Sequence, residues 1–332
     1  MRDTLSDTDG GWPFPGLAIG HWTSPQRPTG CSVLLCPQGA TAGVAVRGGS
    51  PGTRETDLLA PGRQVQQVHA VLLTGGSAFG LDAAGGVMRW LEDHGHGLSV
   101  GPARVPLVPA AVLFDLMLGD ARLRPDAAAG HAACNAARPA PPAQGNVGAG
   151  AGATVGKLFG LGQGMKGGIG WSCTRVGGIH VAALVAVNAL GDVLDEQGAV
   201  MAGARDADGR SRRGQMQRLR AGELPARLQA ASATTIGCVI TDAALDKTQA
   251  HELASLSHHG LSRAVDPITR HDGDTLFALA TGSAGRSADL TMLGAIAADQ
   301  VAAAIRSAVR HARSLSLPGL SLPAWCDLED PA

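Results

Sequence analysis

Two adjacent threonines, Thr234 and Thr235, stand where a side chain could do chemistry. They open the run TTIGCVIT (234–241), whose apolar and β-branched residues predict a buried strand. The stretch before them, 203–233, contains seven arginines, several Asp, Glu and Gln residues, and little regular apolar pattern. Such a segment buries little apolar surface, so we predict that it is exposed and mobile. A mobile segment that leads directly into a core strand at a threonine pair is the most suggestive feature of the chain, although by itself it points only weakly to a function.

Five further polar residues could contribute to a site, but their types alone assign no role. Asp272 and Asp274 flank a glycine, and Asp-Gly-Asp is typical of tight turns. Lys157, Asn188 and Asn146 are common residues in ordinary surroundings. On residue chemistry alone, the structural interpretation is favoured for all five.

Short cofactor and nucleophile motifs fail when their positions are checked. In the glycine-rich stretch 145–157, a Walker loop would need Gly at Ala151 and Ser or Thr at Leu158. A dinucleotide fingerprint would need a third glycine at Ala153 and an acidic partner after a helix. A serine elbow at GGSAFG would need Gly at Phe79. We therefore predict no nucleotide or other cofactor.

Metal-ligand spacing is also missing. His94, His96, His258 and His259 do not form HExxH or another ligand pattern, so no metal site is predicted. The six cysteines are dispersed without a CxxC pair, and the first residues lack a signal-peptide pattern. Reduced thiols in the cytoplasm are the expected state.

The composition indicates a globular protein able to bury a core, with 45% hydrophobic and 17% charged residues. The 47 glycines lie in short runs between aliphatic segments, which suits tight turns in a sheet-rich core. The net charge of −1 gives no electrostatic basis for binding nucleic acid or an anionic membrane. No uninterrupted apolar run is long enough to span a bilayer.

Strands and helices alternate along the chain, which indicates a layered α/β fold in a single domain, 1–332. Apolar, β-branched runs predict strands, and a helical apolar period predicts helices. The predicted strands cover 32–35, 44–46, 68–73, 181–187, 234–241 and 275–280. The predicted helices cover about 81–94, 109–117, 127–138, 246–264 and 287–313.

Long ordered stretches give these residues a joint meaning. They are VRGGSPGTRETDLL (46–59), VLLTGGSAFGLDAAGGVMRWLE (71–92), VPAAVLFDL (108–116), GNVGAGAGATVGK (145–157), KGGIG (166–170), LVAVNALGDV (184–193), TTIGCVITDAAL (234–245) and DGDTLFALATG (272–282). In these stretches the chain resembles the L-aminopeptidase/D-esterase family, also called peptidase family S58. The Asp-Gly-Asp form and the lysine resemble its branch of nylon-oligomer (6-aminohexanoate-oligomer) hydrolases more than the β-peptidyl aminopeptidases.

The resemblance implies an αββα sandwich similar to that of N-terminal-nucleophile hydrolases, with its own connectivity. It also implies a precursor that cuts itself between Ala233 and Thr234 into an α chain (1–233) and a β chain (234–332). The two chains are expected to remain together and to assemble as a homotetramer of α/β heterodimers. Short peptides, other amides or ω-amino-acid oligomers are the implied substrates.

The same resemblance carries functional roles onto individual residues. Thr234 becomes the nucleophile, favoured over Thr235 by its spacing to the Thr-Asp pair at 241–242. The remaining catalytic positions fall on Asp272, Asp274, Asn188 and Lys157, and a substrate-binding position falls on Asn146. One residue departs from the pattern, because relatives often have Asn or Gly where this chain has Ala233.

An N-terminal threonine carries its own base, since a free α-amine titrates near 7.7–8.0 and lies close to the hydroxyl. That amine is absent until the preceding bond is broken, so the hydroxyl of Thr234 would first attack the carbonyl of Ala233. In the mature site it would attack substrate and form an acyl-enzyme, with Asn188 as an oxyanion donor. Two alternatives stay open: an acyl transferase like ornithine acetyltransferase, and an uncut, non-catalytic relative.

Overall fold

The longest strand, β2 (Gly30–Val46), joins the two halves of a large mixed sheet in the computed structural model, which describes residues 12–225 and 233–328. Its first half pairs with β1 (Ala18–Thr23) and β4 (Gln67–Thr74), and its second half pairs with β16 (Thr275–Ala280). The strand order is β10-β11-β14-β16-β2-β4-β7-β3, with β1 also on β2. The other strands of this sheet are β3 (Thr53–Arg54), β7 (Ala110–Val112), β10 (Gly168–Val176), β11 (Ile179–Asn188) and β14 (Thr234–Thr241).

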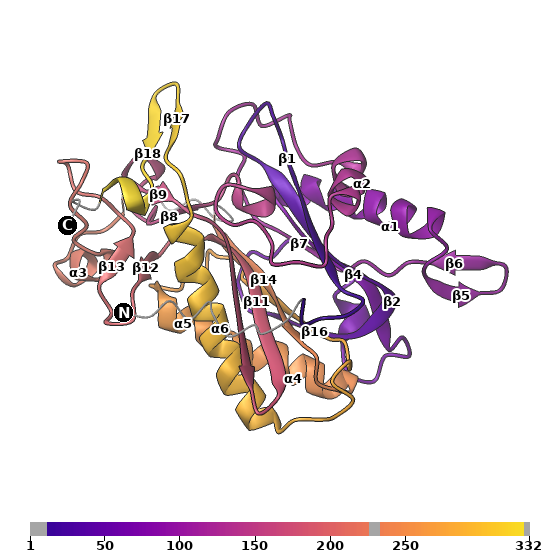
Figure 1. The fold of residues 1–332 in the computed structure, drawn as a ribbon. Helices are drawn as coiled ribbons and strands as arrows, with labels where there is room; N and C mark the ends of the chain where they lie inside the picture. Colours follow the sequence, from indigo (N-terminus) through magenta and orange to yellow (C-terminus); the bar gives the residue numbers. More distant parts are fainter. Residues whose placement is uncertain (1–11, 226–232, 329–332) are drawn as a thin grey trace.

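Alternating side chains along the strands sort the apolar residues into three layers. In β11, Leu184 faces a central cluster that also contains Leu34 and Phe277 from the two halves of the sheet. The next residue, Val185, faces the opposite way into a cluster shared with Ile305 of a covering helix. A third cluster packs the outer face of β2 and β4 against two more helices. The layers are therefore helix, sheet, sheet and helix, as the sequence predicts (Figure 1).

The helices cover the two outer faces separately. One face is covered by α4 (Lys247–Ser257), α5 (His259–Ala264) and α6 (Leu290–Arg310), and the other by α1 (Ala83–Asp93) and α2 (Ala127–Asn135) (Figure 1). The shorter elements are β5 (Leu98–Val100), β6 (Ala103–Val105), β8 (Thr154–Val155), β9 (Met165–Lys166), β12 (Asp192–Leu194), β13 (Val200–Ala202), α3 (Gln215–Arg220), β15 (Val265–Asp266), β17 (Leu315–Leu317) and β18 (Leu320–Leu322).

Most element predictions are confirmed, and β14 and β16 have the predicted bounds. The helix predicted at 109–117 is wrong. Its apolar run instead forms β7, which pairs parallel to β4 and is buried on both faces, so tertiary pairing overrides the helix preference of alanine. The helix predicted at 246–264 is two helices that meet at His258, whose ring bonds the backbone oxygen of Ala45.

The statement that no apolar run could span a bilayer needs a correction. Helix α6 is long and apolar enough by length and composition, yet 67% of its most apolar window is buried inside the protein. It packs on β10, β11, α4 and α5, as the core helix of a layered fold does.

The segment predicted to be exposed is anchored where it is described. Gln215 begins α3 and is fully buried, with its backbone N–H donating to the carboxylate of Asp192. The guanidinium of Arg218 lies over the Phe159 ring, 3.7 Å from its centroid. Part of the segment, 226–232, lies outside the described residues, so its mobility stays a prediction.

Candidate active site

Thr234 is the first residue of β14, and the neighbouring strands bring the other predicted residues to the same end of the sheet. Antiparallel β11 places Asn188, its last residue, directly opposite Thr234. Parallel β16 begins at Thr275, so residues 272–274 lie just before it at that end. Because parallel neighbours begin together and an antiparallel neighbour ends there, three distant stretches of sequence converge.

The hydroxyl of Thr234 lies against the peptide group that precedes it. Its Oγ1 donates to the carbonyl oxygen of Ala233 at 2.5 Å, and the backbone N–H of Gly273 donates to the same oxygen at 3.2 Å. Ala233 is fully buried and forms a parallel bridge with Asp272. The bond between residues 233 and 234 is thus fixed, with a hydroxyl beside it and a backbone donor on its oxygen.

Gly273 allows this close approach. A Cβ at this position would lie 2.9 Å from Thr234 Oγ1 and 2.5 Å from the backbone oxygen of Ser50. On the other side, a Cβ at Gly48 would lie 2.3 Å from the backbone of both Asp272 and Asp274. The Asp-Gly-Asp turn is therefore packed between two backbones, and its glycine leaves room for the nucleophile.

The two aspartates of this turn are bound differently. Asp272 accepts from Leu190 N at 3.2 Å and from Thr269 through both its backbone N–H (3.1 Å) and its hydroxyl (2.6 Å). Asp274 accepts from Thr235 N at 2.7 Å. The hydrogen bonds of Asp272 thus stabilise the turn, whereas the carboxyl of Asp274 is hydrogen-bonded to the start of β14.

Asn188 is the hub of a second set of contacts. Its Oδ1 accepts from the backbone N–H of Thr154 at 3.0 Å, from the hydroxyl of Thr154 at 3.2 Å, and from Lys157 Nζ at 2.6 Å. Its Nδ2 donates one hydrogen to the backbone oxygen of Phe114 at 2.9 Å, and the amide carries a second hydrogen. The side chain is therefore held rigidly beside Thr234.

Burial shifts the pKa values of Lys157 and Asp274 toward neutrality. Desolvation lowers the pKa of Lys157 to about 7, although the negative charges of Asp272 and Asp115 oppose this shift. Desolvation raises the pKa of Asp274 to about 8, and the charge of Asp272 adds to it. An amine and a carboxyl that titrate near neutral pH beside a hydroxyl are suited to proton transfer.

Comparison with known proteins assigns this arrangement to a family. The sequence matches peptidase family S58 over residues 14–319. The chain belongs to peptidase family S58. It is therefore a peptidase or amidase, and the predicted family is confirmed.

The relatives of this S58 peptidase align with most of its length. An uncharacterized aminopeptidase of Mycobacterium leprae is 41% identical over 345 residues, covering 94% of this chain and 92% of the relative. A 6-aminohexanoate-oligomer endohydrolase of Paenarthrobacter ureafaciens is 34% identical over 302 residues, covering 86% and 82%. The solved structure of an L-aminopeptidase D-Ala-esterase/amidase from Ochrobactrum anthropi, described as a variant of the Ntn hydrolase fold, has a TM-score of 0.69 at 21% identity, covering 94% and 89%. This last likeness shows the fold.

Among the residues predicted from the resemblance, the structure of the S58 peptidase brings together Thr234, Asp272, Asp274, Asn188 and Lys157. Asn146 is placed differently. Its side-chain amide donates to the backbone oxygen of Arg313 at 2.9 Å and accepts from the backbone N–H of Arg313 at 3.0 Å. These contacts tie it to the chain after α6, so its proposed role in binding substrate gains no support from them.

Two contributors to the site lie outside the predicted set. Thr154 donates to Asn188 and accepts from Lys157 Nζ at 2.9 Å, and the N–H of Gly273 bonds the Ala233 carbonyl. Thr154 lies inside the stretch GNVGAGAGATVGK, which was a usable signal. A backbone donor leaves no side-chain signal, so sequence reasoning could not single out its role.

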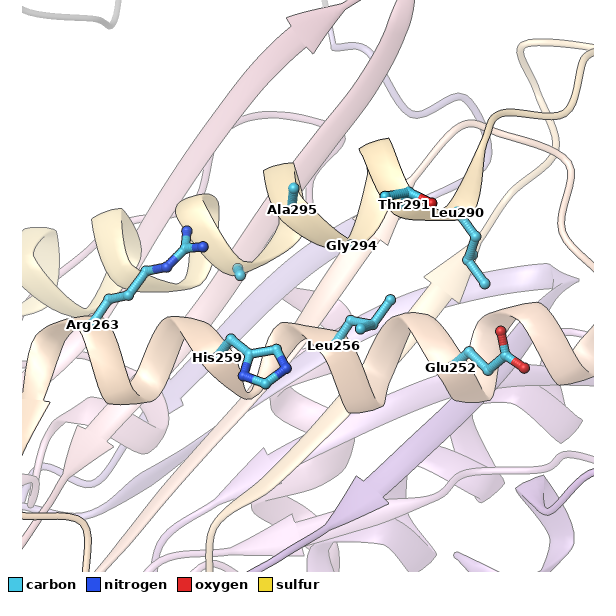
Figure 2. Close-up of a pocket in the computed structure, with 9 residues that line it drawn as sticks. Glu252, Leu256, His259, Arg263, Leu290, Thr291, Gly294 and Ala295 are labelled. Carbon is cyan, nitrogen blue, oxygen red and sulfur yellow. The ribbon is translucent and has the colours of Figure 1, made fainter.

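Of two hollows on the S58 peptidase, one borders the candidate active site and the other lies away from it. A groove of about 440 Å³ runs between α4–α5 and α6 (Figure 2), and its lining includes none of the predicted site residues. A smaller pocket of about 140 Å³ has Asp274 and Gly48 in its wall. Within residues 12–225 and 233–328, no three His, Cys, Asp or Glu side chains are grouped to hold a metal ion.

The raised pKa of Asp274 predicts a pH-dependent stability for the uncut chain. Between its ordinary value of 3.8 and about 8, the folded chain holds a proton that the unfolded chain has lost. The free energy of unfolding should therefore fall as pH rises, by as much as about 1.4 kcal/mol per pH unit. Lys157 acts in the opposite sense only above its pKa of about 7.

Urea denaturation of the Thr234→Ala chain, with and without Asp274→Asn, measures this slope below neutral pH. Asn retains an acceptor for Thr235 N but cannot titrate, so stability should fall less steeply with pH in the double variant than in the single variant. Equal slopes in both chains would contradict a raised pKa at Asp274.

Proposed function

We propose that this protein is an autoproteolytically activated N-terminal-threonine amidohydrolase. It would cleave amide bonds of short peptides or ω-amino-acid oligomers through an acyl-enzyme on Thr234. The observation that carries the proposal is the Thr234 hydroxyl against the Ala233 carbonyl, whose oxygen also accepts from Gly273 N. The names of the relatives, aminopeptidase and 6-aminohexanoate-oligomer endohydrolase, support an amide substrate.

In the uncut chain, Oγ1 of Thr234 attacks the carbonyl carbon of Ala233. The hydroxyl proton passes to a base, for which we propose the neutral amine of Lys157. A pKa of about 7 leaves a large fraction of Lys157 neutral near pH 7. The N–H of Gly273 supports the charge that develops on the carbonyl oxygen. The C–N bond then breaks and the nitrogen takes up a proton, which leaves an ester on Oγ1 and a free amine on Thr234. Water hydrolyses the ester, so one water is consumed overall.

In the mature enzyme, the free amine serves as the base for the hydroxyl that bears it. Asp274 accepts from the backbone N–H of Thr235, the residue after Thr234, so its carboxylate can pair with the α-ammonium. That pairing would lower the pKa of Asp274 from its value in the uncut chain. The second amide hydrogen of Asn188 is the proposed donor to the developing oxyanion. The carbonyl carbon of the substrate bonds to Oγ1, and the amine product leaves with a proton. Water then hydrolyses the acyl-enzyme and restores the Thr234 hydroxyl.

Intact-mass analysis of the purified protein tests the cut. We expect two fragments, of residues 1–233 and 234–332, whose masses together exceed the uncut mass by one water. The fragments should separate under denaturing conditions but elute together in native buffer, because β14 and β16 of one fragment lie between β11 and β2 of the other. A single full-length mass after prolonged incubation would contradict the proposal and favour the non-catalytic alternative.

The acyl-transferase alternative differs only in the acceptor. Both reactions use the same acyl-enzyme, and they separate when an amine is offered alongside water. Incubating the processed protein with an aminoacyl amide and a second amine should release free amino acid. A product in which the second amine carries the acyl group would instead identify a transferase.

A further inference from the structure

Lys166, the first residue of the KGGIG stretch, is fully buried and takes no part in the mechanism above. Its Nζ donates to three backbone carbonyl oxygens, of Gly150 at 2.9 Å, Ala153 at 2.8 Å and Gly167 at 3.0 Å. An ammonium has three hydrogens, so every donor is used. Burying a cation costs free energy, and the dipoles of these three carbonyl groups offset that cost.

The carbonyls that Lys166 holds lead directly to the site. Ala153 precedes Thr154, and Thr154 pairs with Lys166 in the small sheet of β8 and β9. The same Thr154 donates twice to Asn188 and accepts from Lys157. Moving β8 would therefore move the donors that fix Asn188 and the acceptor that fixes Lys157.

The chain is packed closely against the neighbouring backbone at Gly167, the residue after Lys166. A Cβ on Gly167 would lie 2.3 Å from the backbone oxygen of Val187 and 3.1 Å from the backbone nitrogen of Thr154. Val187 immediately precedes Asn188 in β11, so Gly167, which follows β9, lies directly against the strand that carries Asn188. Glycine is therefore required at position 167, because the chain after Lys166 passes so close to the backbones of Val187 and Thr154.

We propose that Lys166 is a positioning residue for the Thr234 reaction, acting through Thr154 to hold Asn188 and Lys157 in place. The inference rests on the proposed function, because it takes Thr234 as the nucleophile.

Lys166 also acts on Lys157 through its charge. Desolvation lowers the pKa of Lys166 to about 7, Asp115 opposes that shift, and Lys157 adds to it. Repulsion acts on both ammonium groups, so we expect that removing the charge of Lys166 favours the charged form of Lys157.

The test follows self-cleavage after cell-free synthesis, because that reaction is unimolecular and needs no added substrate. Lys166→Met should slow cleavage about 10- to 100-fold, the loss expected from a small misplacement of reacting groups. Its pH–rate midpoint should move to higher pH, since cleavage uses the neutral form of Lys157. Lys247→Met is the matched control, because Lys247 Nζ also donates to three carbonyls, of Leu58, Arg63 and Val65, on the far side of the fold.

A double-mutant cycle separates positioning from general stability. If Lys166 acts through Thr154, adding Lys166→Met to Thr154→Val should cost little beyond the larger single effect, whereas Lys247→Met should add independently. Should Lys166→Met fail to fold, Lys166→Gln retains two donors and should show a smaller loss with the same non-additivity. Wild-type rates for a folded Lys166 variant, or an additive cycle, would overturn the inference. An uncut wild-type chain would instead overturn the proposed function, and this inference with it.

Discussion

Replacing Thr234 with Ala is expected to leave a full-length chain of 332 residues that is neither cut nor active on amides. The Thr234 hydroxyl is the nucleophilic group placed against the Ala233 carbonyl, 2.5 Å from its oxygen. Without it no ester forms, so the α-amine that the mature site uses as its base is never released. Intact mass and hydrolysis of an aminoacyl amide should both show complete loss.

The neighbouring threonine supplies the control for this result. Thr235 is equally buried, and its backbone N–H rather than its side chain bonds Asp274, so Thr235→Val should still be cut. Thr234→Ser retains a hydroxyl and should also be cut, although at a different rate. If Thr235→Val were uncut while Thr234→Ala was processed, the nucleophile would be one residue further along.

The second large effect is expected at Asn188. Asn188→Asp has nearly the same shape, and its carboxylate can still accept from Thr154 and Lys157. It can donate neither to the backbone oxygen of Phe114 nor to an oxyanion. Loss of one such donor typically lowers the rate about 10²- to 10³-fold. We therefore expect kcat of the processed enzyme to fall by that factor while KM changes little, because the interaction forms in the transition state.

Asn135 provides a comparison of the same chemistry in a different place. Its Oδ1 accepts from Trp90 Nε1 on the helical face formed by α1 and α2, and it is exposed. Asn135→Asp should therefore leave kcat unchanged. A wild-type kcat for Asn188→Asp would remove Asn188 from the oxyanion site, whatever its effect on stability.

Local patterns were sufficient for most of the elements. The apolar runs 234–241 and 275–280 are buried strands that carry their own signal, because β-branched residues flanked by polar turns have few other ways to bury their side chains. The run at 109–117 carries the same apolar signal but no marker for its partner. Only the pairing of β7 with β4 and β3 decides that it is a strand.

By itself, the sequence determined the layered fold class and the family. It also predicted a site made of Thr234, Asp272, Asp274, Asn188 and Lys157, because the resemblance carries each of them by type and position. The tertiary structure decided what each one touches. It distinguished Asp272, which accepts three hydrogen bonds from Leu190 and Thr269, from Asp274, which accepts from the backbone of Thr235 at the start of β14. It also added Thr154, Lys166 and the N–H of Gly273. Those contributions depend on strand register and on burial, which join residues far apart in the chain and leave no mark in the local sequence.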